Sequence, residues 1–397
     1  MTFNGKTVVL GVTGSIAAYK IATLASSLVK LGADVHVIMT RNAVNFINPI
    51  TFETLTGNKC LVDTFDRNFE FNVEHVSLAK KADVFLIAPA TANVIAKAAH
   101  GIADDMLTTT LLAAECPKLI SPAMNTHMLG NPITQDNLKT LGKYGFQIIT
   151  PASGRLACGD EGSGKMPEPE VLLEYIARAL TVKDLKGKTV LVTAGPTREK
   201  LDPVRFISNL STGKMGYAIA EAAVRRGANV ILVSGPTALD CPLGVNRIDI
   251  VSASDMADAV IRNAKNADIV IKAAAVADFR PASIAEEKIK KHDNEDMTIS
   301  LERTQDILGY LGKHKREGQF LCGFSMETQN MIENTRSKLE SKNVDLMVAN
   351  NVKQEGAGFG VDTNVVTLIS ADDMIELPLQ SKGEVADKLL DYILGHM

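Results

Sequence analysis

The sequence is poor in aromatic residues and has no cysteine pattern that would build a covalent or metal-bound framework. Its 397 residues include no tryptophan, and aromatic residues make up 5% of the chain. The five cysteines are odd in number, widely spaced and without a CxxC pair, so neither a disulfide framework nor a structural zinc site is indicated. Any cysteine with a chemical role must therefore act alone.

Long apolar runs and an excess of one charge are also absent. No run approaches the roughly 20 apolar residues of a membrane helix, and residues 1–6 are polar, unlike a signal peptide. The formal net charge of -4, without long blocks of lysine or arginine, gives no electrostatic basis for binding nucleic acid or an anionic membrane. We therefore expect a cytoplasmic protein whose partners are small molecules.

An internal repeat divides the chain into two similar halves. A chain of this length, with 46% hydrophobic residues, is too long for one ordinary core. Three segments of the first half recur in order in the second: 5–10 (GKTVVL) as 187–192 (GKTVLV), 32–35 (GADV) as 227–230 (GANV), and 82–87 (ADVFLI) as 267–271 (ADIVI). We expect two domains, residues 1–180 and 188–397.

The repeated segments predict an α/β fold with two doubly wound, mostly parallel, Rossmann-like sheets. Runs that are apolar at every position are typical of parallel strands covered on both faces. Between the first two strands, the helical spacing of Ile16, Tyr19, Leu24, Leu28 and Leu31 predicts an apolar helix face. Ligands of such sheets bind beyond the carboxyl ends of the strands.

Residues 151–170 are rich in glycine and proline and lack apolar periodicity. A stretch of this length without secondary structure is either a linker or a functional lid. Because it contains a cysteine, Cys158, we interpret it as a loop that forms a lid.

The turn after the first strand, residues 11–18 (GVTGSIAA), predicts a phosphate site at a helix start. It is not the GxGxxG dinucleotide fingerprint, and no acidic residue ends the second strand, where Thr40 stands between Met39 and Arg41. A mononucleotide therefore fits better than NAD. The alternative is that glycine and serine only start the helix, as they do in many α/β turns.

Two further turns give the first half its resemblance to a known family. Residues 88–93 (APATAN) and 121–128 (SPAMNTHM), with His75 upstream, resemble the flavin-containing cysteine decarboxylases. That family has a tryptophan where this chain has Leu129, so an aromatic packing role at this point is not expected here. The resemblance implies that FMN contacts Gly14, Ser15, Thr40, Ala90 and Thr91.

The same resemblance implies roles for four other residues. Flavin oxidises the carbon that bears sulfur, so that the neighbouring carboxylate can leave. His75 would serve as the base or orienting group, Asn125 would bind that carboxylate with Met128 nearby, and Cys158 would return a proton to carbon. Singly, a histidine, a turn asparagine or a cysteine is more often structural. Together, in family order, they indicate function.

The second half resembles the phosphopantothenate-cysteine ligases. The similarity is carried by residues 207–216 (ISNLSTGKMG), 273–280 (AAAVADFR) and 288–291 (KIKK). The first of these is not a P-loop, because Gly213 and Lys214 are followed by Met215. It lies in an insertion at the ligand end of the sheet, where insertions commonly serve binding.

The ligase resemblance implies 4'-phosphopantothenate, L-cysteine and CTP as substrates, with Mg2+ accompanying the nucleotide. Attack of a carboxylate on a triphosphate requires concentrated positive charge, which Lys288 would supply. Asn209 would assist the acyl-nucleotide step and Arg205 would lie on the phosphate side. The remaining nucleotide contacts implied by the family are Ala273, Ala274, Asp278, Gln305, Asp306, Ile307, Leu308, Phe324, Lys338 and Lys342. The alternative for Lys288 is a solvated basic run, and no residue distinguishes CTP from ATP.

These resemblances predict a bifunctional enzyme of coenzyme A biosynthesis that joins 4'-phosphopantothenate to cysteine and then decarboxylates the product to 4'-phosphopantetheine. A second interpretation is a related cysteine decarboxylase or flavin prenyltransferase fused to a nucleotide-binding domain. A third is a flavin- or nucleotide-sensing regulator. The family's assembly implies a homo-oligomer, with trimers of the first domain and dimers of the second.

Overall fold

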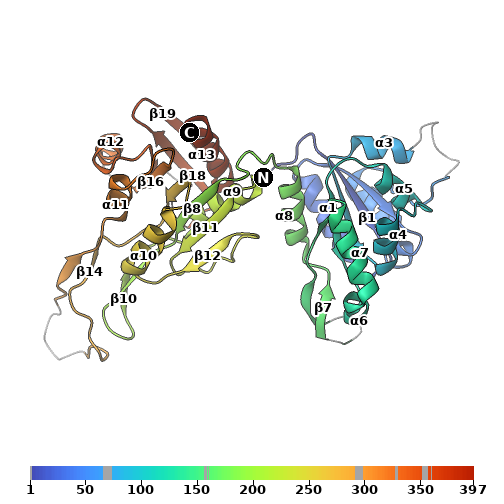
Figure 1. Cartoon of the computed structure of the whole chain (residues 1–397), viewed down its shortest axis with the longest axis horizontal. Helices are drawn as coiled ribbons and strands as arrows, with labels where there is room; N and C mark the ends of the chain where they lie inside the picture. Colours follow the sequence, from blue (N-terminus) through green and yellow to red (C-terminus); the bar gives the residue numbers. More distant parts are fainter. Residues whose placement is uncertain are drawn as a thin grey trace. The chain divides into compact units, whose positions relative to one another are not determined.

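The chain folds into two compact units, Met1–Thr181 and Val182–Met397 (Figure 1). The computed structural model describes residues 2–65, 74–155, 159, 161–290, 298–326, 330–350, 356–358 and 360–397. No helix within these ranges is long and apolar enough to cross a membrane.

The first unit is built on a five-stranded sheet in the order β2-β1-β3-β4-β5, with every pairing parallel. The strands are β1 (Thr7–Val12), β2 (Asp34–Met39), β3 (Val84–Ala90), β4 (Lys118–Pro122) and β5 (Gln147–Ile148). Alternate residues of β1 enter two separate cores, Val8 and Leu10 on one face of the sheet and Val9 on the other. Both faces are therefore covered, as the continuous apolar runs predicted.

Helices and short turns connect these strands. They are η1 (Ile16–Ala18), α1 (Tyr19–Lys30), η2 (Ala43–Asn45), α2 (Pro49–Thr56), α3 (Glu74–Lys81), α4 (Ala92–His100), α5 (Met106–Ala113), α6 (Thr126–Gly130), α7 (Pro132–Lys143) and α8 (Pro169–Leu180). The helix predicted after β1 is confirmed, with Leu24 and Leu28 fully buried. The prediction is wrong for Ile16 and Tyr19, which are 57% and 60% exposed, because Ile16 lies in η1 before the α-helix and Tyr19 is only its first residue.

The second unit has an eight-stranded sheet in the order β12-β11-β8-β13-β16-β17-β18-β19. Its strands are β8 (Thr189–Ala194), β11 (Asn229–Ser234), β12 (Asn246–Asp249), β13 (Ile269–Lys272), β16 (Phe320–Met326), β17 (Leu346–Asn350), β18 (Thr363–Ile369) and β19 (Met374–Ser381). The pairings are parallel as far as β17, and β18 and β19 add an antiparallel edge. Together with the first sheet, this confirms the predicted fold class.

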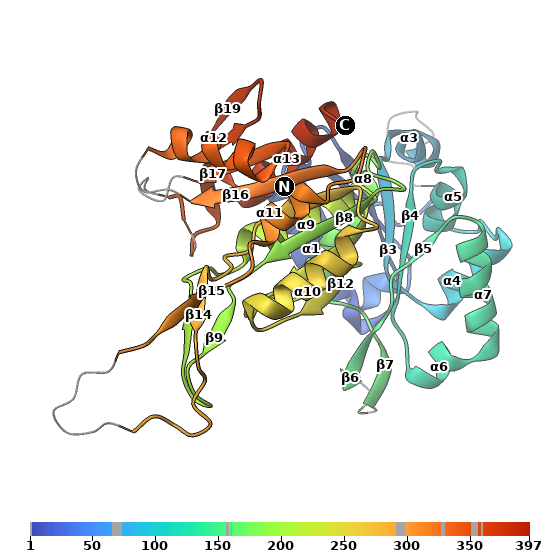
Figure 2. The same cartoon turned by 60° about the vertical axis from the view of Figure 1, so that its left-hand side comes forward.

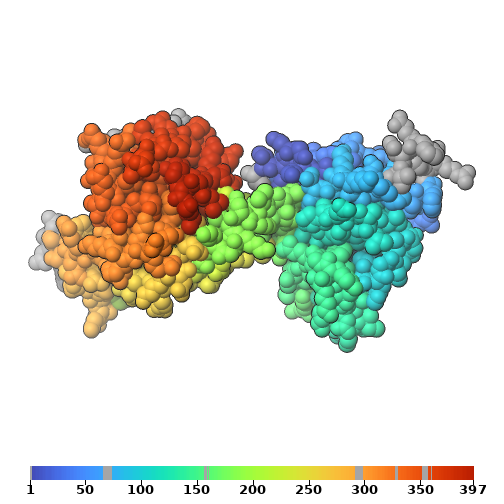
Figure 3. All heavy atoms as spheres, turned by 45° about the horizontal axis from the view of Figure 1, so that its top comes forward, coloured from blue at the N-terminus to red at the C-terminus, as the bar shows by residue number. Residues whose placement is uncertain are grey.

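The helices of the second unit are α9 (Lys214–Arg225), α10 (Ala253–Ala264), α11 (Ile307–Lys313), α12 (Met331–Lys342) and α13 (Lys382–Gly395). In Figure 3, α13 forms part of the outer surface of this unit, in red, while Val385 and Leu389 on its inner side are fully buried. The insertion after β8 forms the hairpin β9 (Arg198–Lys200) and β10 (Phe206–Ser208). It lies beside a second pair, β14 (Phe279–Pro281) and β15 (Leu301–Arg303), as Figure 2 shows.

The sequence repeat corresponds to a repeat in space, because β2-β1-β3 and β11-β8-β13 have the same order and direction. Each half ties its third strand to its first through an aspartate. Asp83 accepts the amide of Thr7 at 2.8 Å, and Asp268 accepts the amide of Thr189 at 2.7 Å. The shared Ala-Asp sequence therefore fixes the entry of the third strand in both units.

Residues 151–170 are not the structureless loop that their composition predicted. They contain an antiparallel hairpin, β6 (Ala152–Arg155) and β7 (Glu161–Lys165), and α8 already begins at Pro169. Glycines at alternate positions hid these strands from an apolar pattern. The hairpin lies beside α6 in Figure 1, with residues 156–158 and 160 outside the described ranges.

Candidate active sites

A cavity of about 1050 Å³ opens at the carboxyl edge of the first sheet. Its lining comes from the turns after β1, β2, β3 and β4, the edge at which a doubly wound fold binds ligands. The predicted residues Gly14, Thr40, Thr91 and Met128 all lie on its wall. We refer to this space as the first cavity.

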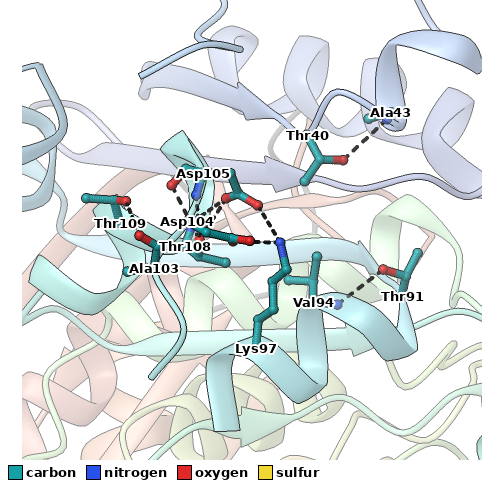
Figure 4. Close-up of polar contacts among 10 residues, drawn as sticks. All are labelled: Thr40, Ala43, Thr91, Val94, Lys97, Ala103, Asp104, Asp105, Thr108 and Thr109. Atoms are coloured by element: carbon teal, nitrogen blue, oxygen red, sulfur yellow. Dashed lines mark hydrogen bonds and ion pairs between the residues drawn. The ribbon is translucent and has the colours of Figure 1, made fainter. Parts of the chain in front are cut away.

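Hydroxyls and a helix start line one part of the first cavity (Figure 4). Thr91 is the N-cap of α4, and its Oγ1 accepts the amide of Val94 at 3.4 Å. The Oγ1 of Thr40 accepts the amide of Ala43 at 3.3 Å. Because a helix start presents amide donors and a positive dipole end, this part of the cavity suits an anionic group.

A charged cluster forms another part of the same wall. The Nζ of Lys97 lies 2.6 Å from Asp104 and 3.2 Å from Asp105, so the end of α4 is joined to the start of α5 (Figure 4). The bond to Asp104 raises the pKa of Lys97 above its usual range. Apolar side chains of Val62, Val94 and Met106 complete the lining. The volume, the apolar wall and the anion-binding end together fit a flat ring with a phosphate tail, such as FMN.

A second cavity of about 480 Å³ is lined in part by the turn after β4, which also contributes to the first cavity. It is lined by the predicted residues Ser15 and Asn125, together with Lys20, Arg155 and Lys165. Asn125 is the N-cap of α6 and accepts the amide of His127 at 2.9 Å. The turn after β4 thus gives Asn125 to the second cavity and, three residues later, Met128 to the first.

The β6–β7 hairpin is fixed on this turn by close backbone contact. The carbonyl oxygen of Gly164 accepts the amide of Met124 at 3.1 Å. A Cβ atom on Gly164 would lie 2.2 Å from the carbonyl oxygen of Met124, and one on Gly162 would lie 2.8 Å from Oγ1 of Thr126. Both glycines also have positive φ, so only glycine fits at these points.

Two other predicted residues of the first unit, His75 and Ala90, do not line either cavity. His75 is half-buried near the start of α3 and makes no hydrogen bond within the described ranges. Ala90 is fully buried at the end of β3, and Leu129 is buried where the decarboxylase family has tryptophan. Cys158 lies outside the described residues.

Two of the remaining thiols are buried in the cores. Burial raises the pKa of Cys60 to about 12 and also raises the pKa of Cys322, which is fully buried. Thiolate is the reactive form, so neither is suited to catalysis.

The second unit has a cavity of about 380 Å³ at the carboxyl edge of its sheet. Five of the predicted residues meet on its wall: Asn209, Ala273, Ala274, Asp278 and Phe324. They come from the turn before α9, the segment after β13 and strand β16. The start of α9 lies on the same wall through Gly213 and Lys214.

Hydrogen bonds between distant segments hold this wall. The Nδ2 of Asn209 donates to the carbonyl oxygen of Ala275 at 3.0 Å, and the amide of Ala275 donates to Gly195 at 3.0 Å. The Oγ1 of Thr197 accepts the amide of Ala277 at 3.0 Å. The insertion after β8 is therefore fastened to the segment that carries Asp278.

Arg205 contacts the residue that follows Lys288, and neither Arg205 nor Lys288 lines this cavity. The Nη2 of Arg205 donates to the carbonyl oxygen of Ile289 at 3.0 Å. Buried Asp202 accepts the amides of Arg205 at 2.7 Å and Ile289 at 3.2 Å. Burial alone would raise the pKa of Asp202, but these backbone amides lower it. Lys288 itself is exposed and does not line the described cavity.

The remaining predicted residues gather at α11 and α12. Asp306 caps α11 by accepting the amide of Gly309 at 3.0 Å, and it forms an ion pair with Lys342 of α12. Lys338 lies one turn before Lys342 on α12. Gln305 is exposed, Leu308 is half-buried and the side chain of Ile307 is in the core.

The sequence patterns did not single out Asp202 or Lys272. In the sequence Asp202 precedes Pro203, and this pair, which is typical of turns, could have indicated Asp202. Lys272 ends the apolar strand β13, where burial lowers its pKa to about 8 despite the charges of Asp306 and Asp278. Within the described ranges, no three histidine, cysteine, aspartate or glutamate side chains are grouped to hold a metal ion.

Two known protein families match the two halves of the chain. Residues 2–181 match the family described as "Flavoprotein", and residues 185–397 match "DNA/pantothenate metabolism flavoprotein C-terminal domain". The chain is 50% identical over 395 residues to the "Coenzyme A biosynthesis bifunctional protein CoaBC" of Bacillus subtilis (strain 168), covering 98% of this chain and 97% of that protein.

A second full-length relative agrees. The protein of the same description from Escherichia coli (strain K12) is 43% identical over 397 residues, covering 99% of this chain and 98% of that one. The solved C-terminal domain of a protein so described is 49% identical and covers 54% of this chain and 97% of its own, with a TM-score of 0.47. On the full-length identities and the two family matches, the chain belongs to the bifunctional coenzyme A biosynthesis family, which combines phosphopantothenoylcysteine decarboxylase and phosphopantothenate-cysteine ligase activities.

Proposed function

We propose that the first unit, residues 1–180, decarboxylates 4'-phosphopantothenoylcysteine with FMN, and that the second, residues 188–397, makes this substrate from 4'-phosphopantothenate, L-cysteine and CTP. The observation that supports the division best is the turn that carries Asn125 and Met128. It lies between two cavities of the first unit, one suited to a flavin and one open to a substrate. The second unit repeats the fold but has a different cavity at the same edge.

In the first unit, Gly14, Ser15, Thr40, Ala90 and Thr91 would hold FMN, with hydroxyls and helix-start amides available to its phosphate. Bound FMN supplies two-electron oxidation and re-reduction of the carbon that carries sulfur. Asn125 would bind and orient the carboxylate that leaves, and Met128 would contact the substrate from the same turn. His75 orients the substrate or accepts a proton from it. The hairpin that borders the second cavity excludes water.

Cys158 donates the proton that the product carbon requires. The support for this role is its place in the sequence between β6 and β7, the two strands that border the second cavity. A thiol that acts as a proton donor must be accessible, in contrast to Cys60 and Cys322, which are buried.

In the second unit, Lys288 binds the triphosphate and offsets the repulsion between it and the attacking carboxylate. Arg205 binds on the phosphate side of the substrate and Asn209 positions the reacting carbonyl. Asp202 is a positioning residue for both cations, because it fixes the backbone at Arg205 and at Ile289. We assign Mg2+ to the nucleotide, since in such sites this ion binds substrate phosphates together with several waters and one or two carboxylates.

The nucleotide itself would lie along Ala273, Ala274 and Asp278 and reach the Asp306–Lys342 pair. The other contacts in this proposal are Gln305, Ile307, Leu308, Phe324 and Lys338. Ile307 would contribute through its backbone, since its side chain is in the core.

The enzyme is proposed to act as a homo-oligomer in the cytoplasm, where thiols such as cysteine stay reduced. Dimerisation of the second unit is supported by apolar side chains on its paired strands. Phe206, Phe279 and Leu301 are 47%, 46% and 48% exposed. Trimers of the first unit are supported by the exposure of Leu112 and Ile133, at 65% and 72%.

The test uses two variants of the full chain, each expected to block one of the two reactions at a defined step. Lys288→Gln should stop pyrophosphate release from CTP yet still evolve carbon dioxide from added 4'-phosphopantothenoylcysteine. Cys158→Ala should release carbon dioxide but stop at an oxidised product. Equal loss of both activities in either variant would contradict two separate sites, and normal turnover by Cys158→Ala would remove its role as proton donor.

A further inference from the structure

Three cationic side chains on the second cavity have no part in the chemistry described above. Lys20 comes from α1, Arg155 from β6 and Lys165 from β7. Asn125, which is proposed to hold the reacting carboxylate, lies on the same wall. The cavity therefore combines the proposed reaction site with a set of positive charges.

Lys20 and Lys165 lie close together because they share one carboxylate oxygen. The Nζ of Lys20 is 2.7 Å from Oε1 of Glu168, and the Nζ of Lys165 is 3.4 Å from the same atom. The Lys20 side chain is 9% exposed, and its Nζ also lies 3.5 Å from the carbonyl oxygen of Met166. Two ammonium groups with one carboxylate leave a net positive charge at this point.

Arg155 adds a further positive charge to the same wall. It is exposed at the end of β6 and forms no ion pair within the described ranges. Glu161 lies opposite Arg155 in the hairpin register but is not on the cavity wall. A guanidinium of this kind is suited to paired hydrogen bonds with phosphate oxygens.

Apolar side chains lie beside these charges on the same wall. Ile16 and Tyr19 are more than half exposed in the unit, yet both line the second cavity. Exposed side chains of this size beside buried polar groups are typical of a surface that a ligand covers. The ligand that fits is elongated, with an apolar or amide middle and an anionic end.

We propose that Lys165 and Arg155, with Lys20 beneath them, form a subsite for a phosphate monoester. Building on the proposed function, the occupant is the 4'-phosphate of phosphopantothenoylcysteine, whose carboxylate lies at Asn125. A phosphate monoester carries about -1.5 to -2 charges at pH 7, which the net charge of this subsite offsets. The subsite would make the decarboxylase select phosphorylated substrates over otherwise identical thiols.

The structural alternative is that the Lys20–Glu168–Lys165 group only fastens the hairpin to α1 and α8. A measurement of the preference for phosphorylated substrate distinguishes the subsite from this alternative. A group that only holds the hairpin would affect phosphorylated and unphosphorylated substrates alike. The variants are Lys165→Gln, Arg155→Gln, the double variant and the conservative Lys165→Arg. The matched control is Lys139→Gln, a 72% exposed lysine of α7 that pairs with Asp136.

The experiment compares kcat/KM for carbon dioxide release from 4'-phosphopantothenoylcysteine and from pantothenoylcysteine, using the FMN-loaded full chain. Each lost charge should lower the ratio of the two kcat/KM values about tenfold, as expected for a charge-assisted bond to phosphate. Lys165→Arg should keep most of the preference, and Lys139→Gln should keep all of it. An unchanged ratio in the double variant would overturn the subsite, even if both rates fall.

A binding measurement separates failure of the subsite from failure of the proposed function. Calorimetry on the same proteins compares 4'-phosphopantetheine with pantetheine, and needs no turnover. Tighter binding of the phosphorylated compound, lost in the double variant, supports the subsite whether or not carbon dioxide is released. Equal binding of the two compounds by the wild-type chain overturns it. Absence of carbon dioxide release from either substrate would instead contradict the proposed decarboxylase.

Discussion

Replacing Gly164 by alanine should move the β6–β7 hairpin off the turn that carries Asn125. The new Cβ would lie 2.2 Å from the carbonyl oxygen of Met124, whereas an ordinary C···O contact is about 3.3 Å. The hairpin must therefore shift by about 1 Å, which lengthens the 3.1 Å hydrogen bond from Met124 to Gly164. A misplacement of that size near reacting groups costs about 100-fold in rate.

Gly154 provides the matched control in the same hairpin. Its φ of 146° is close to the 141° of Gly164, so alanine at either position incurs a similar backbone strain of about 1 to 3 kcal/mol. A Cβ on Gly154 meets no atom within 4 Å. The difference between the two variants therefore isolates the contact with Met124.

The assay measures carbon dioxide release and pyrophosphate release by the same preparation. Gly164→Ala should lose about 100-fold in decarboxylation with ligation unchanged, and Gly154→Ala should lose less than about tenfold. Equal losses in the two variants would refute the reasoning, because backbone strain alone would then explain both.

Three further predictions concern stability and reactivity. Burial would raise the pKa of Asp34, but the bond to Lys81 and neighbouring groups lower it to about 2. This carboxylate therefore stabilises the fold above about pH 4 and loses that effect as pH falls toward 2. In Asp34→Asn the free energy of unfolding should depend less on pH in this range, as acid unfolding followed by circular dichroism can check. Arg226 is buried and paired with two aspartates that are themselves 37% and 67% exposed, so Arg226→Met leaves no fully buried charge. This substitution should lower the urea-derived free energy of unfolding of the second unit by about 2 kcal/mol. Cys60 should resist alkylation in the native protein while exposed Cys241 reacts, as peptide mass spectrometry can check; rapid labelling of Cys60 would contradict its burial.

The sequence was most informative where one interaction dominates. Continuous apolar runs predicted the parallel strands, because a strand buried on both faces tolerates few polar side chains. The repeated Ala-Asp sequence before the third strand was visible as a pattern, and the structure gives its reason in the bonds of Asp83 and Asp268 to the first strands.

The sequence was least informative where backbone contacts decide the structure. The β6–β7 hairpin has glycine at positions 154, 162 and 164, so its strands show no apolar alternation. Its position depends on a carbonyl of Met124, which no pattern in the chain reveals. Likewise, Ile16 and Tyr19 fit a helical rhythm but line a cavity, because a tight turn precedes α1.

The candidate sites were predictable as motifs but not as assemblies. The turns that carry Thr91, Asn125 and Asn209 follow strands, so their place at the carboxyl edge was expected. Contacts between segments far apart in the chain, such as Asp202 with Ile289, depend on tertiary structure and left no local signal. Family resemblance supplied His75 and Lys288, which line none of the cavities described for the two units.

The most direct test of two linked activities in one chain is the stoichiometry of a single reaction. The purified protein would be supplied with 4'-phosphopantothenate, cysteine, CTP and Mg2+, and all products would be quantified by mass spectrometry and gas analysis. We predict one pyrophosphate and one carbon dioxide for every 4'-phosphopantetheine formed. Accumulation of 4'-phosphopantothenoylcysteine without carbon dioxide, in a preparation that contains bound flavin, would contradict the account.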